Sequence, residues 1–371
     1  TTYYKKAETF CWTEKEEAGI KVLHHNFFTA GIGYLKVLFN TEVLPPEDLP
    51  YAGLLKSILG SVSTEHYSYS DLTSEIHLNS GGVDFSVTSY ANLEKPEQFT
   101  GAFVASIRVL YDKLDFGFTM LEEILNHSVF TDEKRLGEVI QETRSRAKMK
   151  LENAGHSTAV SRATSYFSAT AYYNELTGGT AYYHFLEQLE KDYAAKKGEI
   201  IARLQEVSKK LFTRANMLVN YTADDKGYEK LPETLNLLAD QLPQGNRETY
   251  AFTHPLKNLN EGLKTSAQVD YVARCGNFRD AGLQYTGALK ILQVILSYDY
   301  LWLNIRVKGG AYGCMSGFGR SGEGYLVSYR DPNLKETNEI YEGIPAYLEA
   351  FDPDERDMTK YVIGTISNLD A

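Results

Sequence analysis

Cysteine, long apolar runs and excess positive charge are all scarce in this 371-residue sequence. The three cysteines, Cys11, Cys275 and Cys314, are odd in number and far apart, which excludes a disulfide framework and a cysteine-based zinc knuckle. No apolar run approaches the roughly 20 residues that span a bilayer. The 38 basic residues are outnumbered by 49 acidic ones, giving a net charge of −11, so binding to nucleic acid or to a membrane is not expected.

The first residues lack the apolar core of a signal peptide, which makes the cytoplasm the default compartment, with an organelle not excluded. Thr1 stands where an initiator methionine would, and this indicates a processed chain or a piece cut from a longer one. The composition, with 43% hydrophobic and 23% charged residues, is typical of an acidic globular α/β protein.

Familiar catalytic motifs are also missing. None of the eight histidines stands in H-E-x-x-H or H-x-x-E-H, so no zinc site can be read from the sequence. Residues 317–322 match G-x-G-x-x-G, but a strand-like sequence follows them instead of a helix, which indicates a hairpin turn. A dyad of His156 and Ser157 is disfavoured, because adjacent side chains diverge on a helix and Ser157 is expected to cap one.

Strand-like and helix-like patterns alternate twice along the chain. In the first half we expect strands at 34–40 and 83–89 and helices at 51–59, 98–112, 113–127 and 132–153. Two further helices are expected over 185–211. After a polar segment at 213–216 we expect a strand at 217–222, helices near 228–242 and 285–303, and strands near 269–272 and 325–330. The pattern predicts an α+β fold of two successive domains, 1–212 and 213–371, similar in plan, each with an antiparallel-rich sheet backed by helices.

The most informative stretch is 304–313, where an apolar helix leads into Gly309 and Gly310. Glycines within a strand indicate a bulge or a ligand that closely approaches the backbone. Arg306 and Tyr312 flank these glycines and carry hydrogen-bond donors that suit a carbonyl or its oxyanion. Composition alone favours an ordinary bulged strand with a solvated arginine over a functional site.

Several stretches together carry a family resemblance. Residues 304–313, with the stretches 155–159, 178–179, 328–334 and 363–370, resemble the insulinase/pitrilysin family of zinc metallopeptidases, most closely its presequence-protease subfamily. The resemblance implies a clamshell built of two halves. The N-terminal half carries zinc, and the C-terminal half is non-catalytic. This chain resembles the C-terminal half, and further helical sequence is expected beyond Ala371.

The zinc motif of the family is degenerate in this chain. Aligning Gly60 and Ser61 with the Gly-Ser that follows the family motif places Tyr51, Leu54 and Leu55 on its metal-binding and general-base positions. Two leucines and a tyrosine cannot hold zinc or activate water, and they are expected to fill a core. Glu142, near the position of the third ligand, is expected to be a helix-surface carboxylate. The resemblance thus implies no metal or cofactor in this chain and no activity on its own.

The resemblance also implies a role within a larger enzyme. Arg306 and Tyr312 would reach across a chamber to the substrate and transition state, with Gly309 and Gly310 against the substrate. The expected partners are a zinc-bearing N-terminal half of the same polypeptide, or an active partner subunit, and an unstructured peptide substrate. The alternative is a stand-alone inactive partner or scaffold subunit of the same superfamily, which binds peptides or an active partner without catalysis.

Overall fold

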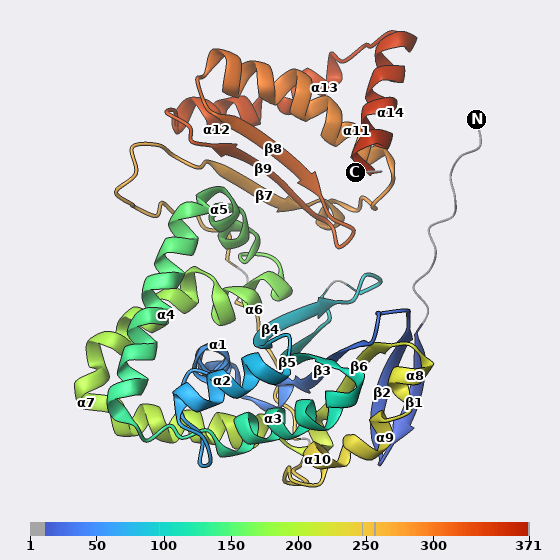
Figure 1. Cartoon of the computed structure of the whole chain (residues 1–371). Helices are drawn as coiled ribbons and strands as arrows, with labels where there is room; N and C mark the ends of the chain where they lie inside the picture. Colours follow the sequence, from blue (N-terminus) through green and yellow to red (C-terminus); the bar gives the residue numbers. More distant parts are fainter. Residues whose placement is uncertain (1–11, 96, 247, 256, 370–371) are drawn as a thin grey trace. The chain divides into compact units, whose positions relative to one another are not determined.

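The computed structural model describes residues 12–95, 97–246, 248–255 and 257–369, which form two compact units (Figure 1). The first unit consists of the described residues within Thr1–Ser89, Thr100–Arg146 and Leu176–Phe252. The second consists of those within Tyr90–Phe99, Ala147–Glu175 and Thr253–Ala371. Neither unit is therefore a continuous stretch of the chain. No helix among the described residues is long and apolar enough to cross a membrane.

A six-stranded sheet is the basis of the first unit, with the strand order β1-β2-β6-β3-β5-β4. Its strands are β1 (Thr13–Glu17), β2 (Ile20–Asn26), β3 (Ile32–Asn40), β4 (Val83–Ala91), β5 (Phe99–Leu110) and β6 (Met217–Ala223). β2 and β6 run parallel, whereas β1–β2, β3–β5 and β3–β6 are antiparallel. The sheet is antiparallel-rich, as the sequence predicts.

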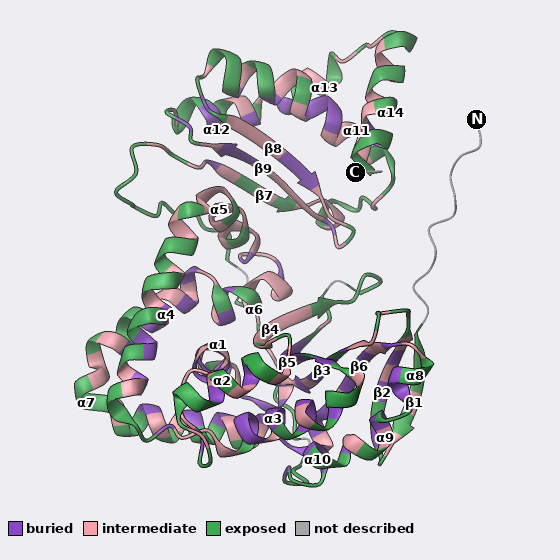
Figure 2. Cartoon of the chain, viewed as in Figure 1, coloured by how far each residue is buried: buried purple, intermediate pink, exposed green. Residues whose placement is uncertain are grey.

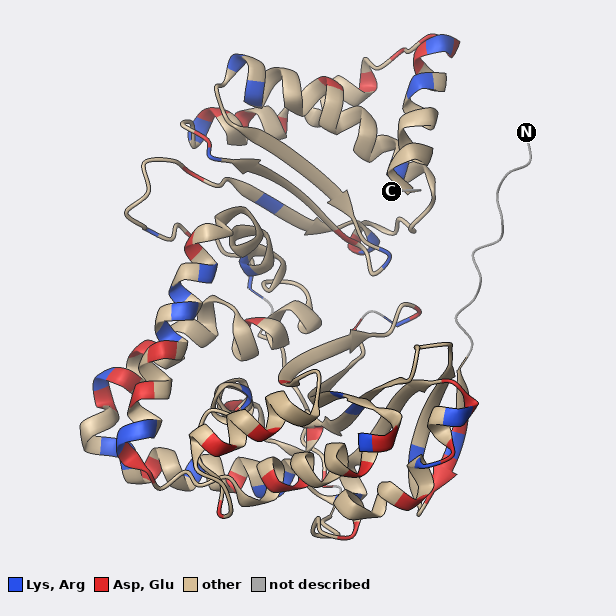
Figure 3. Ribbon diagram, in the orientation of Figure 1, with Lys and Arg blue, Asp and Glu red and all other residues tan. Residues whose placement is uncertain are grey.

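Helices pack on this sheet through residues that alternate along the strands. In β3, Leu35, Val37 and Phe39 are buried, while the alternating residues Tyr34 and Lys36 are exposed, because successive side chains point to opposite faces. The helices of this region are α1 (Leu49–Ile58), α2 (Tyr69–Asn79), α3 (Leu114–His127), α4 (Glu133–Asn153) and α7 (Thr180–Leu211), followed by the single turns α8 (Asp225–Tyr228), α9 (Leu231–Thr234) and α10 (Asn236–Ala239). Figure 2 shows the buried residues gathered where helices meet strands, and Figure 3 shows charges of both signs along α4 and α7.

The second unit contains a three-stranded antiparallel sheet in the order β7-β9-β8 (Figure 1). Its strands are β7 (Ala273–Asn277), β8 (Gly313–Phe318) and β9 (Glu323–Tyr329), and its helices include α5 (Gly155–Thr164), α6 (Ala169–Gly178), α11 (Ala288–Ile295), η6 (Leu296–Lys308), α12 (Lys335–Glu342), α13 (Ile344–Glu349) and α14 (Glu355–Leu369). α5 packs against β7 and β9. The core on the opposite side joins Leu301 and Ile305 of η6 to Tyr341 of α12. The α+β class with helix-backed antiparallel sheets is thus confirmed.

Several expected elements differ in type or length. The prediction of a helix at 98–112 is wrong, because these residues form β5, an inner strand between β3 and β4. Both of its faces are covered, so residues 101–105 are all buried and the alternation that reveals a strand is lost. The two helices expected over 185–211 are one helix, α7, and the helix near 228–242 is three short turns, α8 to α10.

The compact units do not coincide with the expected domains 1–212 and 213–371. Residues 217–222 do form a strand, β6, but it pairs with β2 and β3 in the first unit. His24 of β2 and the carbonyl of Ala223 at the end of β6 are joined by a 2.9 Å hydrogen bond across 199 residues of sequence. Local patterning shows where a strand begins, but it does not identify the sheet that the strand joins.

Candidate functional site

The residues predicted to form a site lie at a helix-to-strand turn in the second unit. α11 continues without a break into η6, a π-helical segment that ends at Lys308. Arg306 therefore lies in the last turn of a helix, and Tyr312 directly precedes β8. The expectation of a bulged strand is wrong, because the two glycines end a helix and do not interrupt a strand. Irregular helical segments of this kind are frequent at functional sites.

Gly309 and Gly310 make the sharp turn between the helix and the strand. Gly310 has a φ of +83°, a left-handed conformation that favours glycine. Its N–H donates to the carbonyl of Arg306 at 3.0 Å, and the N–H of Ala311 donates to the carbonyl of Ile305 at 3.1 Å. A Cβ atom on Gly309 would lie 2.6 Å from the carbonyl oxygen of Ile305, so no other residue fits there without a shift. Both glycines are required by the turn itself.

The turn brings Arg306 and Tyr312 together. The guanidinium carbon of Arg306 lies 4.0 Å from the ring centroid of Trp302 and 5.7 Å from that of Tyr312. The backbone N–H of Tyr312 donates to the carbonyl of Tyr329 at 3.0 Å, which anchors Tyr312 to β9. The side chain of Tyr312 is 66% exposed. A permanent cation and a phenol are therefore presented side by side to solvent, and within the described part of the chain they are held by ring contacts and not by ion pairs.

The stretch 328–334, which contributes to the family resemblance, supports the glycine turn. Asp331 is fully buried, and its carboxylate accepts hydrogen bonds from the N–H of Asn333 at 2.9 Å and the hydroxyl of Thr337 at 2.6 Å. The side-chain amide of Asn333 donates to the carbonyl of Gly309 at 2.5 Å. A buried carboxylate thus orients the residue that fixes the turn.

Aromatic rings lie beneath Tyr312. The ring of Tyr329 is 5.8 Å from that of Tyr312, 5.5 Å from that of Tyr271 and 5.0 Å from the imidazole of His156, which it meets edge to face. The absence of a side chain at Gly155 leaves the space that Tyr271 occupies. Nδ1 of His156 is buried and has no hydrogen-bond partner among the described residues. Sequence reasoning does not connect His156 with Tyr312; the only signal is that both lie in stretches of the resemblance.

Near this site in the second unit lie Ser157, the 317–322 stretch and Cys314. Ser157 does not cap α5, because that helix begins at Gly155 and its N-cap is Ala154. The 317–322 stretch is a hairpin turn between β8 and β9, as predicted. Burial raises the pKa of Cys314, two residues after Tyr312, to about 11, which keeps this thiol protonated at neutral pH and makes it a poor nucleophile.

The positions that match the zinc motif of the family do not fit a metal. Leu54 and Leu55 of α1 are fully buried, and the ring of Tyr51 packs edge to face against Phe185 at 5.0 Å. None of the three presents a nitrogen, thiolate or carboxylate ligand. The expectation that they fill a core is confirmed for the two leucines, whereas Tyr51 is only half-buried. Glu142 is exposed on α4, 3.9 Å from Arg135, as expected of a surface carboxylate.

Two family models match this chain. A model of the region associated with subfamily C of the M16 peptidases matches residues 4–189, and a model of the "PreP C-terminal domain" matches residues 260–371. Together they cover both the region of the degenerate motif and the Arg306–Tyr312 turn.

Curated relatives are similar over almost the whole chain. The chain is 40% identical to "Protein HypA" of Clostridium perfringens, over 99% of this chain and 37% of that protein. It is 31% identical to "Presequence protease 1, chloroplastic/mitochondrial" of Arabidopsis thaliana, over 99% of this chain and 34% of that protein. The chain therefore spans about a third of the length of these relatives.

Two solved structures share the fold. A conserved protein from Enterococcus faecalis aligns with a TM-score of 0.64 and 16% identity, covering 94% of this chain and 83% of that one. A "peptidase M16 inactive domain" from Pseudomonas fluorescens aligns with a TM-score of 0.56 and 15% identity, covering 96% of this chain and 84% of that one. At these identities the likeness concerns the fold alone.

Proposed function

This chain belongs to the peptidase M16 family as a C-terminal, inactive-domain half related to presequence proteases, and we propose that it closes the substrate chamber of a zinc metalloendopeptidase. The expected partner is a zinc-bearing N-terminal half, either in the same polypeptide or in a separate active subunit. The expected substrates are unstructured peptides, because a closed chamber admits a flexible chain more readily than a folded domain.

The observation that carries the proposal is the pairing of Arg306 with Tyr312 on an exposed turn. Neither side chain is needed for the core: the phenol is largely solvent-exposed, and Arg306 forms no ion pair in the described part of the chain. Both are nevertheless held in place by a buried carboxylate, two glycines and a set of packed rings. A surface pair that is supported so heavily is better explained by binding than by stability.

The chemistry of the pair suits the transition state of peptide hydrolysis. Tyr312 can donate one hydrogen bond to a developing oxyanion, while Arg306 supplies a permanent positive charge and several donors in a planar fork. Preorganised donors of this kind stabilise charge that appears only in the transition state. Zinc bound by the partner half would activate the attacking water.

Gly309 and Gly310 are proposed to face the substrate backbone. A Cβ atom on Gly310 would meet only the ring of Pro332, at 3.8 Å, so the outer side of this residue is open. A bare backbone between Arg306 and Tyr312 lets a peptide approach the turn closely.

A second candidate is a stand-alone inactive subunit that binds peptides or an active partner without catalysis. It is compatible with the fold, which a solved "peptidase M16 inactive domain" shares. In this case Arg306 and Tyr312 would bind a peptide and not act on it.

The two candidates are separated by assaying an unstructured peptide with the isolated chain, with the full-length gene product and with that product lacking residues 1–371. The proposal expects activity only in the full-length product, inhibited by a metal chelator. Full activity after removal of residues 1–371 would reject chamber closure. A gene product no larger than this chain would leave only a separate subunit as the partner and would favour the second candidate.

A further inference from the structure

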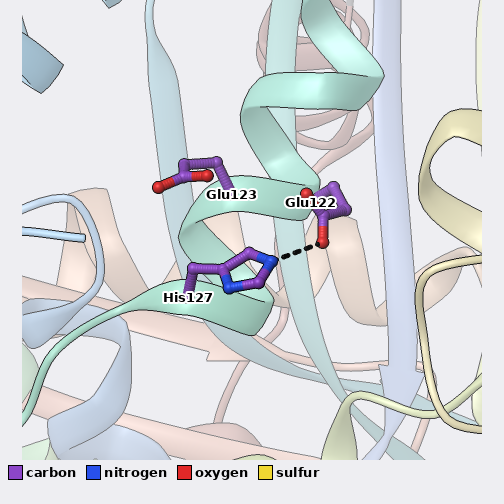
Figure 4. A group of neighbouring side chains, drawn as sticks. All are labelled: Glu122, Glu123 and His127. Atoms are coloured by element: carbon purple, nitrogen blue, oxygen red, sulfur yellow. Dashed lines mark ion pairs between the residues drawn. The ribbon is translucent and has the colours of Figure 1, made fainter. Parts of the chain in front are cut away.

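A cluster of two carboxylates and one imidazole lies in the first unit, apart from the Arg306–Tyr312 turn in sequence and in structural unit (Figure 4). Glu122, Glu123 and His127, at the C-terminal end of α3, each offer one ligand atom, and the three atoms lie within 4.8 Å of one another. Glu123 and His127 are four residues apart, a spacing that places both on one helix face. We propose that these three side chains bind a divalent transition-metal ion, with Zn²⁺ as the best match.

His127 is oriented for this role by Glu65. Its Nδ1 lies 2.9 Å from the Glu65 carboxylate, and its Nε2 lies 3.1 Å from the Glu122 carboxylate. If Nδ1 keeps its proton and donates to Glu65, the lone pair of Nε2 points toward Glu122 and is free for a metal. Histidines that bind metals almost always donate their other ring N–H to an acceptor such as a carboxylate, which fixes the tautomer. Glu65 is therefore the positioning residue of the site.

Glu123 is supported in the same way by the segment that precedes α2. Its buried carboxylate accepts hydrogen bonds from the backbone N–H of His66 at 3.2 Å and from Nδ1 of His66 at 2.9 Å. The carboxylate is thus fixed in direction.

The charges of the cluster are not balanced by lysine or arginine. In the described part of the chain, the ion pairs of Glu65, Glu122 and Glu123 are formed only with the imidazoles of His66 and His127. Three carboxylates therefore lie close together without a lysine or arginine partner in the described part of the chain. A divalent cation at Nε2 of His127 would offset most of this charge, and a proton on His127 is its competitor for the same lone pair.

The donor set selects the class of metal. One imidazole nitrogen and two carboxylate oxygens suit zinc or its transition-metal neighbours, whereas Mg²⁺ and Ca²⁺ prefer oxygen alone. Tetrahedral zinc places its ligand atoms roughly 3.3 Å apart, given Zn–N and Zn–O distances of about 2.0–2.2 Å. The present separations, up to 4.8 Å, must therefore contract by side-chain movement when the ion binds, with water as the fourth ligand. All three ligands would come from the C-terminal end of α3.

The proposal is tested by titrating Zn²⁺ into the chain alone, in competition with a chromophoric zinc chelator. The expected result is one tightly bound ion per chain that Mg²⁺ does not displace. His127→Gln and Glu122→Gln should each weaken binding more than tenfold, and Glu65→Gln should weaken it about 10–100-fold through loss of orientation. His184→Gln is the matched control, because His184 also pairs with a carboxylate, that of Glu187 at 3.1 Å, but belongs to no three-residue ligand group among the described residues. This variant should bind as the unmodified chain does.

A second readout uses the proton that the metal displaces. Zn²⁺ affinity of the unmodified chain should fall as the pH is lowered from about 7.5 to about 6.0, and this dependence should be weaker in His127→Gln. Circular dichroism checks that each variant is folded. If a variant is not folded, the visible absorption of Co²⁺ bound to the unmodified chain tests the proposal instead. A four-coordinate site with a nitrogen ligand gives intense Co²⁺ bands. Equal binding by the unmodified chain and His127→Gln, or no Co²⁺ bands, would overturn the proposal.

Discussion

The side-chain amide of Asn333 donates a 2.5 Å hydrogen bond to the carbonyl of Gly309 and so joins two separate stretches of the second unit. One stretch contains the turn that presents Arg306 and Tyr312, and the other contains the buried Asp331. The position of the exposed pair therefore depends on residues that would never touch a substrate. This relationship makes it possible to separate the contribution of positioning from that of chemistry.

Removing the Tyr312 hydroxyl tests the proposed chemistry. In the full-length protein, Tyr312→Phe should lower kcat by roughly 10²–10³-fold, about 3–4 kcal/mol, because one preorganised donor to the oxyanion is lost. Steady-state kinetics on an unstructured peptide measure this effect. Tyr298→Phe is the control, since Tyr298 is an exposed tyrosine of η6 outside the turn. A kcat for Tyr312→Phe close to that of the control would contradict the assignment.

Replacing Arg306 tests whether its charge or its shape matters. Arg306→Ala should lower kcat/KM, and Arg306→Lys should recover only part of it, because lysine keeps the charge but lacks the planar fork of donors. The free energy of unfolding should change by no more than about 1 kcal/mol, since the contacts with Trp302 and Tyr312 are exposed. Lys308→Ala controls for the loss of a nearby charge. If Arg306→Ala, Arg306→Lys and Lys308→Ala have equal kcat/KM values, Arg306 makes no specific contact with the substrate.

Asn333 should act only through the turn that it holds. Asn333→Ala should lower kcat and destabilise the protein by about 0.5–1.5 kcal/mol, the usual contribution of one hydrogen bond. In a double variant with Tyr312→Phe, the loss of kcat should be much smaller than the product of the two separate losses. Fully multiplicative losses would show that Asn333 does not act by positioning Tyr312.

Two glycines should respond oppositely to alanine. Gly310→Ala should destabilise the chain by about 1–2 kcal/mol, because its φ of +83° disfavours a residue with a Cβ atom. Gly198→Ala should instead stabilise it by about 0.5–1 kcal/mol, because Gly198 lies within α7 and a Cβ atom there would meet nothing within 4 Å. Chemical denaturation of the isolated chain measures both. A destabilising Gly198→Ala would contradict this account of backbone freedom.

The sequence predicts most elements of the fold but fails where burial is complete. β3 and β4 alternate in polarity along the sequence and are predicted to within two residues at each end, and in β3 burial follows the same alternation. β5 is apolar on both faces over 101–105, and its pattern therefore suggests a helix. The pairing of β6 with β2 and β3 leaves no local signal, since register is decided by partners far away in the chain.

The candidate site is predicted in its residues but not in its geometry. Arg306 and Tyr312 are brought together, yet through a helix end and not along a strand. Glycine patterns mark a backbone that must bend, but they do not distinguish a bulge from a helix terminus. The cluster around His127 is not predicted at all, because two glutamates and one histidine within 122–127 match none of the zinc motifs sought in the sequence, and the positioning residue Glu65 lies 62 residues away.

The insertion of β6 between β2 and β3 has a consequence for synthesis of the protein on the ribosome. Until residue 223 has left the exit tunnel, β2 and β3 expose unpaired backbone edges and their apolar faces lack a neighbour. Contacts between strands so far apart in sequence form slowly, because the intervening loop must first close. The nascent first unit is therefore vulnerable to aggregation for most of its translation, and chaperone binding is most needed in the interval between emergence of β3 and arrival of β6.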